Sequence, residues 1–183
     1  MSSAQTYTRS AVSLHWLIAA LVLAMLALGI YMHELPLSPL KLQLYSYHKW
    51  IGVSIFALMG LRLAWRITHA PPPLPATVPR WQQRAAHALH HSLYLLLFAI
   101  PLSGWLMSSA KGFTTVWLGL VPLPDLVDKN RELGKVLTDV HKWLNLALAG
   151  MIAAHVLAAL KHHFIDRDGL LARMRWPQKE VRQ

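Results

Sequence analysis

Four long apolar segments constrain the fold of this chain more than any other feature. They cover about residues 10–32, 44–67, 83–108 and 139–163. Each is close to the roughly 20 residues that an α-helix needs to cross the apolar interior of a bilayer. A chain of 183 residues has little length left for a second domain once these helices are assigned. We therefore predict an all-α fold, an integral membrane four-helix bundle in which residues 1–183 form one domain.

The composition agrees with a membrane protein and excludes several other classes. Only 14% of the residues are charged, against about 25% in soluble domains. Because the chain has no cysteine, it forms no disulfides, cysteine-ligated iron–sulfur clusters or thiolate metal sites. The net charge of +10 would suit nucleic acid, but the basic residues lie at the ends of apolar segments and form no recognition motif. We expect no nucleic-acid partner.

The connections between the segments carry their own signals. Ser10 is a predicted N-cap for the first helix. Pro36 and Pro39 indicate a short loop, and the second segment is expected to begin near residue 44. Residues 109–137 form the longest connection, in which we expect a short surface helix that caps the bundle.

The distribution of Lys and Arg predicts the orientation in the membrane. The N-terminus, the 62–84 connection and the C-terminal tail together hold eleven Lys or Arg and three acidic residues, whereas the other side holds seven and five. Cytoplasmic loops collect Lys and Arg. We therefore expect both termini in the cytoplasm, with the first and third segments running outward and the second and fourth running inward.

With this topology, four histidines fall at two depths. His48 and His141 begin inward-running segments and lie near the outer surface, whereas His15 begins an outward-running segment near the inner surface. His155 follows His141 by fourteen residues, which is about 21 Å along a helix and returns to within about 40° of the same face. The depths therefore match in two pairs, His48 with His141 and His15 with His155.

These pairs have a specific chemical reading. Ionisable side chains inside a membrane are costly, so they indicate a functional site. Two imidazoles that face each other across a helix bundle can hold one haem iron. With both axial positions filled, the iron has no open position for oxygen and exchanges single electrons. We predict two such metal sites, with His15, His48, His141 and His155 as ligands.

Other readings of the histidines stay open. A single histidine in a membrane helix can simply hydrogen-bond a carbonyl or line a cavity. His87 or His90 lies at a depth similar to that of His15 and could replace it as the inner ligand. The other histidines near the cytoplasmic boundary, where a polar tip at the interface is ordinary, are His91, His162 and His163.

Charged and small residues near the pairs have two interpretations each. Lys49 and Lys142 directly follow the outer histidines, and Lys111 lies in the outer connection. These lysines could steer an anionic substrate to the outer haem, or they could pair with haem propionates or lipid phosphates. On the inner side, Arg62 and Arg66 could pair with propionates or extend to lipid headgroups. Small residues that could make room for a macrocycle, or serve plain helix packing, are Gly29, Gly52, Gly104 and Gly150.

Several motifs resemble the bacterial cytochrome b561 family over about residues 8–177. They are Ser13-Leu14-His15-Trp16, Tyr47-His48-Lys49-Trp50-Ile51-Gly52, Ala86-His87-Ala88-Leu89-His90, Ala154-His155 and, most specific, Lys161-His162-His163-Phe164-Ile165-Asp166-Arg167-Asp168-Gly169-Leu170-Leu171. The family includes a superoxide oxidase that reduces ubiquinone, and cytochrome b subunits of some hydrogenases are related to it. The resemblance implies a bacterial inner-membrane protein with two b-type haems and quinone as a partner. By position, it implies the same four axial ligands as the depth matching does.

We thus expect a di-haem cytochrome that transfers single electrons to or from quinone. An enzyme resembling a superoxide:ubiquinone oxidoreductase, with superoxide oxidised at the periplasmic face, is the form we favour. One alternative is the membrane anchor and electron-transfer subunit of a larger oxidoreductase, with a redox partner docked on the periplasmic residues 109–137. Another is a haem-free, histidine-lined metal-binding or transport protein.

Overall fold

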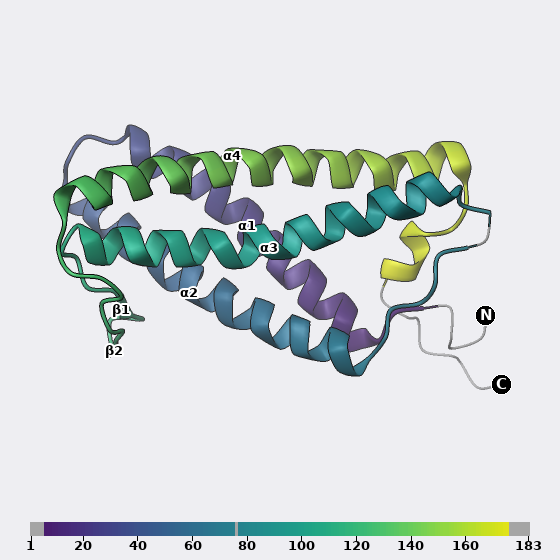
Figure 1. Cartoon of the computed structure of the whole chain (residues 1–183), viewed down its shortest axis with the longest axis horizontal. Helices are drawn as coiled ribbons and strands as arrows, with labels where there is room; N and C mark the ends of the chain where they lie inside the picture. Colours follow the sequence, from purple (N-terminus) through teal and green to yellow (C-terminus); the bar gives the residue numbers. More distant parts are fainter. Residues whose placement is uncertain (1–5, 76, 176–183) are drawn as a thin grey trace.

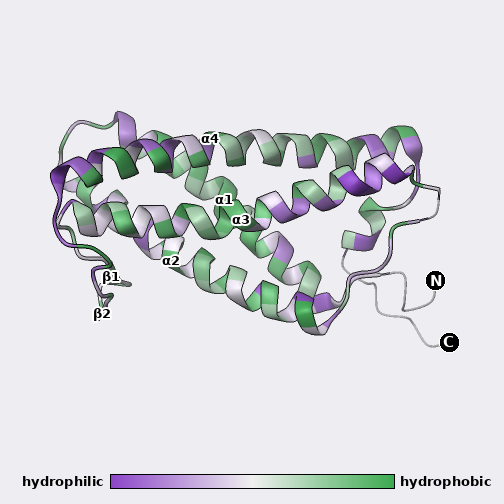
Figure 2. Ribbon diagram, in the orientation of Figure 1, coloured by the Kyte–Doolittle hydropathy of each residue, from purple (hydrophilic) through white to green (hydrophobic). Residues whose placement is uncertain are grey.

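The computed structural model describes residues 6–75 and 77–175. It contains four long helices, α1 (Arg9–Glu34), α2 (Pro39–Thr68), α3 (Arg80–Ala110) and α4 (Arg131–Lys161). Each is long and apolar enough to cross a membrane. Apolar residues dominate the middle of the helices and polar ones gather toward their ends (Figure 2). These helices confirm the predicted membrane four-helix bundle.

Three of the four long helices, α1, α2 and α4, begin at a capping side chain that lies upstream of the predicted start. Thr8, rather than Ser10, caps α1 and accepts a hydrogen bond from the Ala11 amide. Ser38 caps α2 through the Lys41 amide, and Pro39 is the first helical residue. Proline suits this position because the first amides of a helix have no partner inside the helix. The prediction that Pro39 belongs to a loop is therefore wrong.

The longest connection also differs from the expectation. Between Lys111 and Asn130 the chain has no helix; instead β1 (Val116–Trp117) and β2 (Val121–Pro122) pair as a small antiparallel ribbon. The segment expected to supply a surface helix belongs partly to α4, because Asn130 caps that helix through the Leu133 amide. The ribbon is attached to α2 by a hydrogen bond of 3.2 Å from the Trp117 indole to Ser54.

The helices contact one another chiefly in chain order, α1 with α2, α2 with α3 and α3 with α4. Figure 1 shows α3 and α4 running along each other, while α1 and α2 diverge from them toward the end where α1 begins and α2 ends. Direct contacts of α4 with α1 or α2 are sparse in the described part of the chain. The buried core nevertheless draws on all four helices, through Ile18, Val22, Ile55, Met59, Leu96, Ile100 and Leu148.

The C-terminal segment folds back on the end of the bundle where α1 begins. After α4, a short π-helix, η2 (His162–Asp166), and a short 3₁₀-helix, η3 (Leu171–Met174), reverse the chain direction. The Trp16 indole donates a hydrogen bond of 2.9 Å to the Met174 carbonyl, and Arg173 donates one of 2.7 Å to the Pro73 carbonyl. The start of α1, the α2–α3 connection and the end of the described chain therefore share one end of the molecule.

Candidate functional site

The four histidines predicted as ligands form two pairs inside the bundle. His48 of α2 and His141 of α4 have ring centres 6.4 Å apart, with ring planes at 74°. His15 of α1 and His155 of α4 have ring centres 6.3 Å apart, with planes at 76°. The two pairs thus have nearly the same geometry, and in each of them α4 faces one of the helices with which it makes few other contacts.

An apolar layer separates the two pairs. Leu148 stands midway between His141 and His155 on α4 and is only 3% exposed. Met59 of α2, at 1% exposed, belongs to the same core cluster. Buried apolar side chains therefore lie between the two pairs, which are separate sites.

In the His48–His141 pair, called the outer pair after the predicted orientation, His141 is held by residues of α3. The Nδ1 atom of His141 lies 2.9 Å from the Ser103 hydroxyl. A Cβ atom at Gly104 would lie 3.2 Å from the Cε1 atom of the same ring, so the absence of a side chain there lets His141 lie against α3. In contrast, the buried Nδ1 atom of His48 has no hydrogen-bond partner in the described chain.

The inner pair lies among further basic groups. The ring centre of His90 on α3 is 5.3 Å from that of His155, so three histidines meet here rather than two. Arg62 lies close by and is fixed by the protein itself: its Nη1 donates to the Ala11 carbonyl and its Nε to the Tyr94 hydroxyl, both at 3.1 Å. Arg62 therefore joins α2 to both α1 and α3 at this level.

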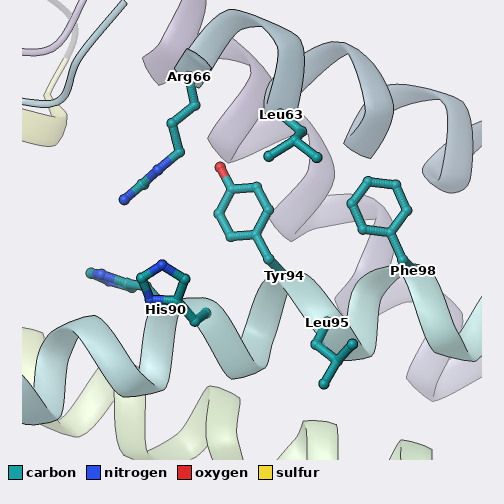
Figure 3. Close-up of a pocket in the computed structure, with 7 residues that line it drawn as sticks. Leu63, Arg66, His90, Tyr94, Leu95 and Phe98 are labelled. Atoms are coloured by element: carbon teal, nitrogen blue, oxygen red, sulfur yellow. The ribbon is translucent and has the colours of Figure 1, made fainter.

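A cavity of about 200 Å³ lies between α2 and α3 and is lined by His90, the neighbour of His155. Figure 3 shows Arg66 and His90 at one side of it and the Tyr94 ring between them and the apolar side chains. The Arg66 guanidinium lies 5.5 Å from the centre of the Tyr94 ring. The apolar lining consists of Leu63, Leu95 and Phe98. This cavity combines apolar walls with a cationic side chain, a combination that suits a largely apolar group with acidic substituents.

The spacing of each pair fits one metal ion between two imidazoles. With imidazole–metal bonds of about 2.0–2.1 Å on opposite sides of one ion, the ring centres lie about 6.2–6.4 Å apart. The observed 6.3 and 6.4 Å match this separation, whereas the 5.3 Å between His90 and His155 is too short for it.

The predicted steering lysines differ in their surroundings. Lys49 is half-buried and donates a hydrogen bond of 3.1 Å to the Ser108 hydroxyl, so its ammonium group already has a partner. Lys111 and Lys142 are exposed. Lys111 also lines an outer groove of about 620 Å³ together with Lys129, Arg131 and Lys135. Four basic side chains therefore line this groove, only one of which is among the three predicted steering lysines.

The remaining histidines lie outside the two pairs. His87 and His91 are exposed at the start of α3. His162 contacts Asp168 at 2.6 Å and Asp166 at 3.2 Å, and these three residues are close enough to hold a metal ion. Since the Lys161 ammonium already contacts Asp166 at 2.5 Å, ion pairing accounts for this cluster without a metal.

Sequence reasoning missed Ser103 as a partner of His141. A serine inside an apolar helix usually bonds to the preceding turn, and Ser103 does so with Ile100, so its sequence context carries no special signal. Gly29 and Gly104 were recognised only as residues that could make room. The structure shows that they face rings of the outer pair. A Cβ added at Gly29 would lie 3.5 Å from Cε1 of His48, and one added at Gly104 would lie 3.2 Å from Cε1 of His141.

Comparisons with known proteins agree with this architecture. The family model described as prokaryotic cytochrome b561 matches residues 6–177. Cytochrome b561 homolog 2 of Escherichia coli (strain K12) is 36% identical over 171 residues, which cover 87% of this chain and 86% of that protein. Cytochrome b561 homolog 1 of the same organism is 34% identical over 128 residues, or 69% and 72% of the two chains. A protein named probable superoxide oxidase CybB from Yersinia pestis is 27% identical over 178 residues, or 92% and 94%.

Proposed function

Because the chain belongs to the prokaryotic cytochrome b561 family, we propose that it holds two b-type haems in the bacterial inner membrane and passes single electrons between its outer end and quinone. The observation that carries this proposal is the pair of matched ring separations, 6.3 and 6.4 Å. His48 and His141 would hold the outer haem, and His15 and His155 the inner one. Each haem, when bound, supplies an iron centre that exchanges one electron.

The protein side chains perform the remaining tasks. The four imidazoles would hold the two haems, two to each iron, and an iron held in this way would favour electron transfer over oxygen binding. Leu148 and Met59 supply buried apolar side chains between the sites. Arg66 faces the cavity beside the inner pair, where its guanidinium suits a haem propionate. Arg62 is the second candidate partner for a propionate, although two of its donors are already engaged.

His15, rather than His90, is the inner ligand in this proposal. The His90 ring lies too close to His155 for one ion to be coordinated between them on opposite sides. His15 has the same separation from its partner as the outer pair has. His90 then lies beside the inner site and lines the adjoining cavity.

Superoxide is the electron donor that the outer charges favour. Lys111 and Lys142 are exposed near the outer pair, and a cluster of positive charge raises the encounter rate with a small anion. One relative of this chain is named probable superoxide oxidase, which makes superoxide the donor to test first. Quinone is the matching acceptor, because it is dissolved in the lipid that surrounds the helices.

The test measures electron transfer in the purified, haem-containing protein. Reduction should produce the sharp visible bands of low-spin b-type haem, and a superoxide pulse should reduce the haem faster at low ionic strength than at high. Lys111→Gln combined with Lys142→Gln should weaken this salt dependence, whereas Lys41→Gln should not, because the Lys41 ammonium is bonded to the His33 and Leu35 carbonyls at the start of α2. A rate that salt does not change would exclude electrostatic steering, and a protein without the haem bands would exclude the whole proposal.

A further inference from the structure

The two histidine pairs match in spacing but differ in their hydrogen bonds. Within residues 6–75 and 77–175, His141 is the only one of the four whose ring is hydrogen-bonded to another side chain, that of Ser103. The Nδ1 atom of its partner His48 is buried and unpartnered. In the outer pair, the Nδ1 atom of His141 therefore has a hydrogen-bond partner and that of His48 has none in the described chain.

The direction of the anchoring hydrogen bond follows from the second contact of Ser103. Its hydroxyl also lies 2.8 Å from the Ile100 carbonyl, one turn earlier on α3. A carbonyl only accepts, so the single hydroxyl proton of Ser103 is donated to Ile100. Toward His141 the hydroxyl oxygen is then the acceptor, and the Nδ1 atom of His141 carries the proton.

This arrangement leaves the other ring nitrogen of His141, Nε2, without a proton. A neutral imidazole has one protonated and one unprotonated nitrogen, and the unprotonated one is the metal ligand. Ser103 is only 6% exposed, so water competes little for its hydroxyl. Gly104, the next residue, leaves room for the ring against α3. Ser103 and Gly104 together hold the His141 ring in one tautomer and one place.

We propose that Ser103 is a positioning residue that makes the outer haem easier to oxidise than it would otherwise be. The inference rests on the proposed function, because it requires a haem between His48 and His141. A hydrogen bond from Nδ1 raises the basicity of the ligating nitrogen, and a stronger donor stabilises the oxidised iron relative to the reduced iron. Hydrogen bonding around a centre is one of the means by which a protein sets its reduction potential. The serine thereby favours electron flow from the outer site to the inner site.

The experiment is a spectroscopic redox titration of the holoprotein and of serine variants. In Ser103→Ala the midpoint potential of the outer haem should rise and that of the inner haem should stay unchanged. A tenfold change in the ratio of oxidised to reduced iron corresponds to 59 mV for one electron, and we expect a shift up to about that size. The outer couple is identified as the one that is lost in His48→Ala.

Conservative and matched variants separate the hydrogen bond from packing. Ser103→Thr keeps the hydroxyl and should keep the wild-type potential. Ser103→Cys replaces it with a weak acceptor and should give a smaller rise, which preserves the test if the alanine variant does not fold. Ser13→Ala removes a helical serine near the inner pair whose hydroxyl bonds only the Arg9 carbonyl, and it should shift neither potential.

Two results would overturn the inference. One is an outer potential that stays the same or falls in both Ser103→Ala and Ser103→Cys, and the other is an equal shift of both haems. In either case the protein would still contain two haems, so the proposed function would stand. Loss of haem from the wild-type protein would instead contradict the proposed function itself.

Discussion

At the scale of single residues, the position of His141 depends on glycine at position 104, which has no side chain. An added Cβ at Gly104 would approach the His141 ring to 3.2 Å, closer than ordinary van der Waals contact. Gly104→Ala should therefore displace the ring and weaken haem retention at the outer site, at a cost of about 1–3 kcal/mol for overpacking. The measurement is the rate at which each haem passes to an excess of a haem-scavenging protein.

Gly150→Ala is the matched control for this prediction. Gly150 follows His141 by nine residues and so lies about 180° from it around α4, away from the face that carries His141 and His155. An added Cβ there meets nothing within 4 Å, and alanine is the better helix former. Haem retention should therefore match that of the wild type. Equal retention in Gly104→Ala would show that His141 does not need the space at Gly104.

The residues that sequence could find are those whose position follows from topology alone. Once the direction of each helix is set, depth depends only on the number of residues from the helix end, and this is enough to group His48 with His141 and His15 with His155. Contacts around a helix axis are different, because they depend on how neighbouring helices rotate and cross. The 2.9 Å approach of Ser103 to His141 and the 5.3 Å approach of His90 to His155 could therefore be read only from the structure.

At the scale of secondary-structure elements, Arg62 is the side chain that joins three helices at the inner level. Arg62→Leu removes its hydrogen bonds to Ala11 on α1 and Tyr94 on α3 and leaves two acceptors without this partner. Hydrogen bonds to charged groups contribute about 1.5–3 kcal/mol, so the apparent melting temperature in detergent should fall clearly.

Arg66→Leu is the comparison for this variant. Arg66 has a cation–π contact with Tyr94, an interaction of about 0.5–1 kcal/mol at exposed sites. The loss of stability should thus be smaller than in Arg62→Leu. A larger loss in Arg66→Leu would mean that Arg66, not Arg62, holds this part of the bundle together.

The starts of two helices show that capping residues, rather than hydropathy, decide where a helix begins. The apolar pattern places the second segment from about residue 44, but α2 begins at Pro39, because proline and a capping serine can start a helix before the apolar face does. Similarly, α4 begins at Arg131 in a polar stretch capped by Asn130. Hydropathy predicts the part of a helix within the membrane, and caps decide where the helix begins.

At the scale of the whole molecule, the charge distribution predicts the orientation. The end of the bundle that contains the start of α1 and the end of the described chain belongs to the side with eleven Lys or Arg and three acidic residues. We expect this end in the cytoplasm. A fluorescent protein fused to the C-terminus should fluoresce, and an alkaline phosphatase fused there should be inactive. The opposite pattern would reverse the assignment of the outer and inner sites.

The central claim is that the two histidine pairs each hold one haem, and the most direct measurement is the haem content per chain. The wild type should contain two haems, and single alanine variants of His15, His48, His141 and His155 should each contain one. His90→Ala should retain both, because His90 is not an axial ligand in this account. A wild-type chain with fewer than two haems, or a His90→Ala protein that loses one while His15→Ala keeps two, would contradict it.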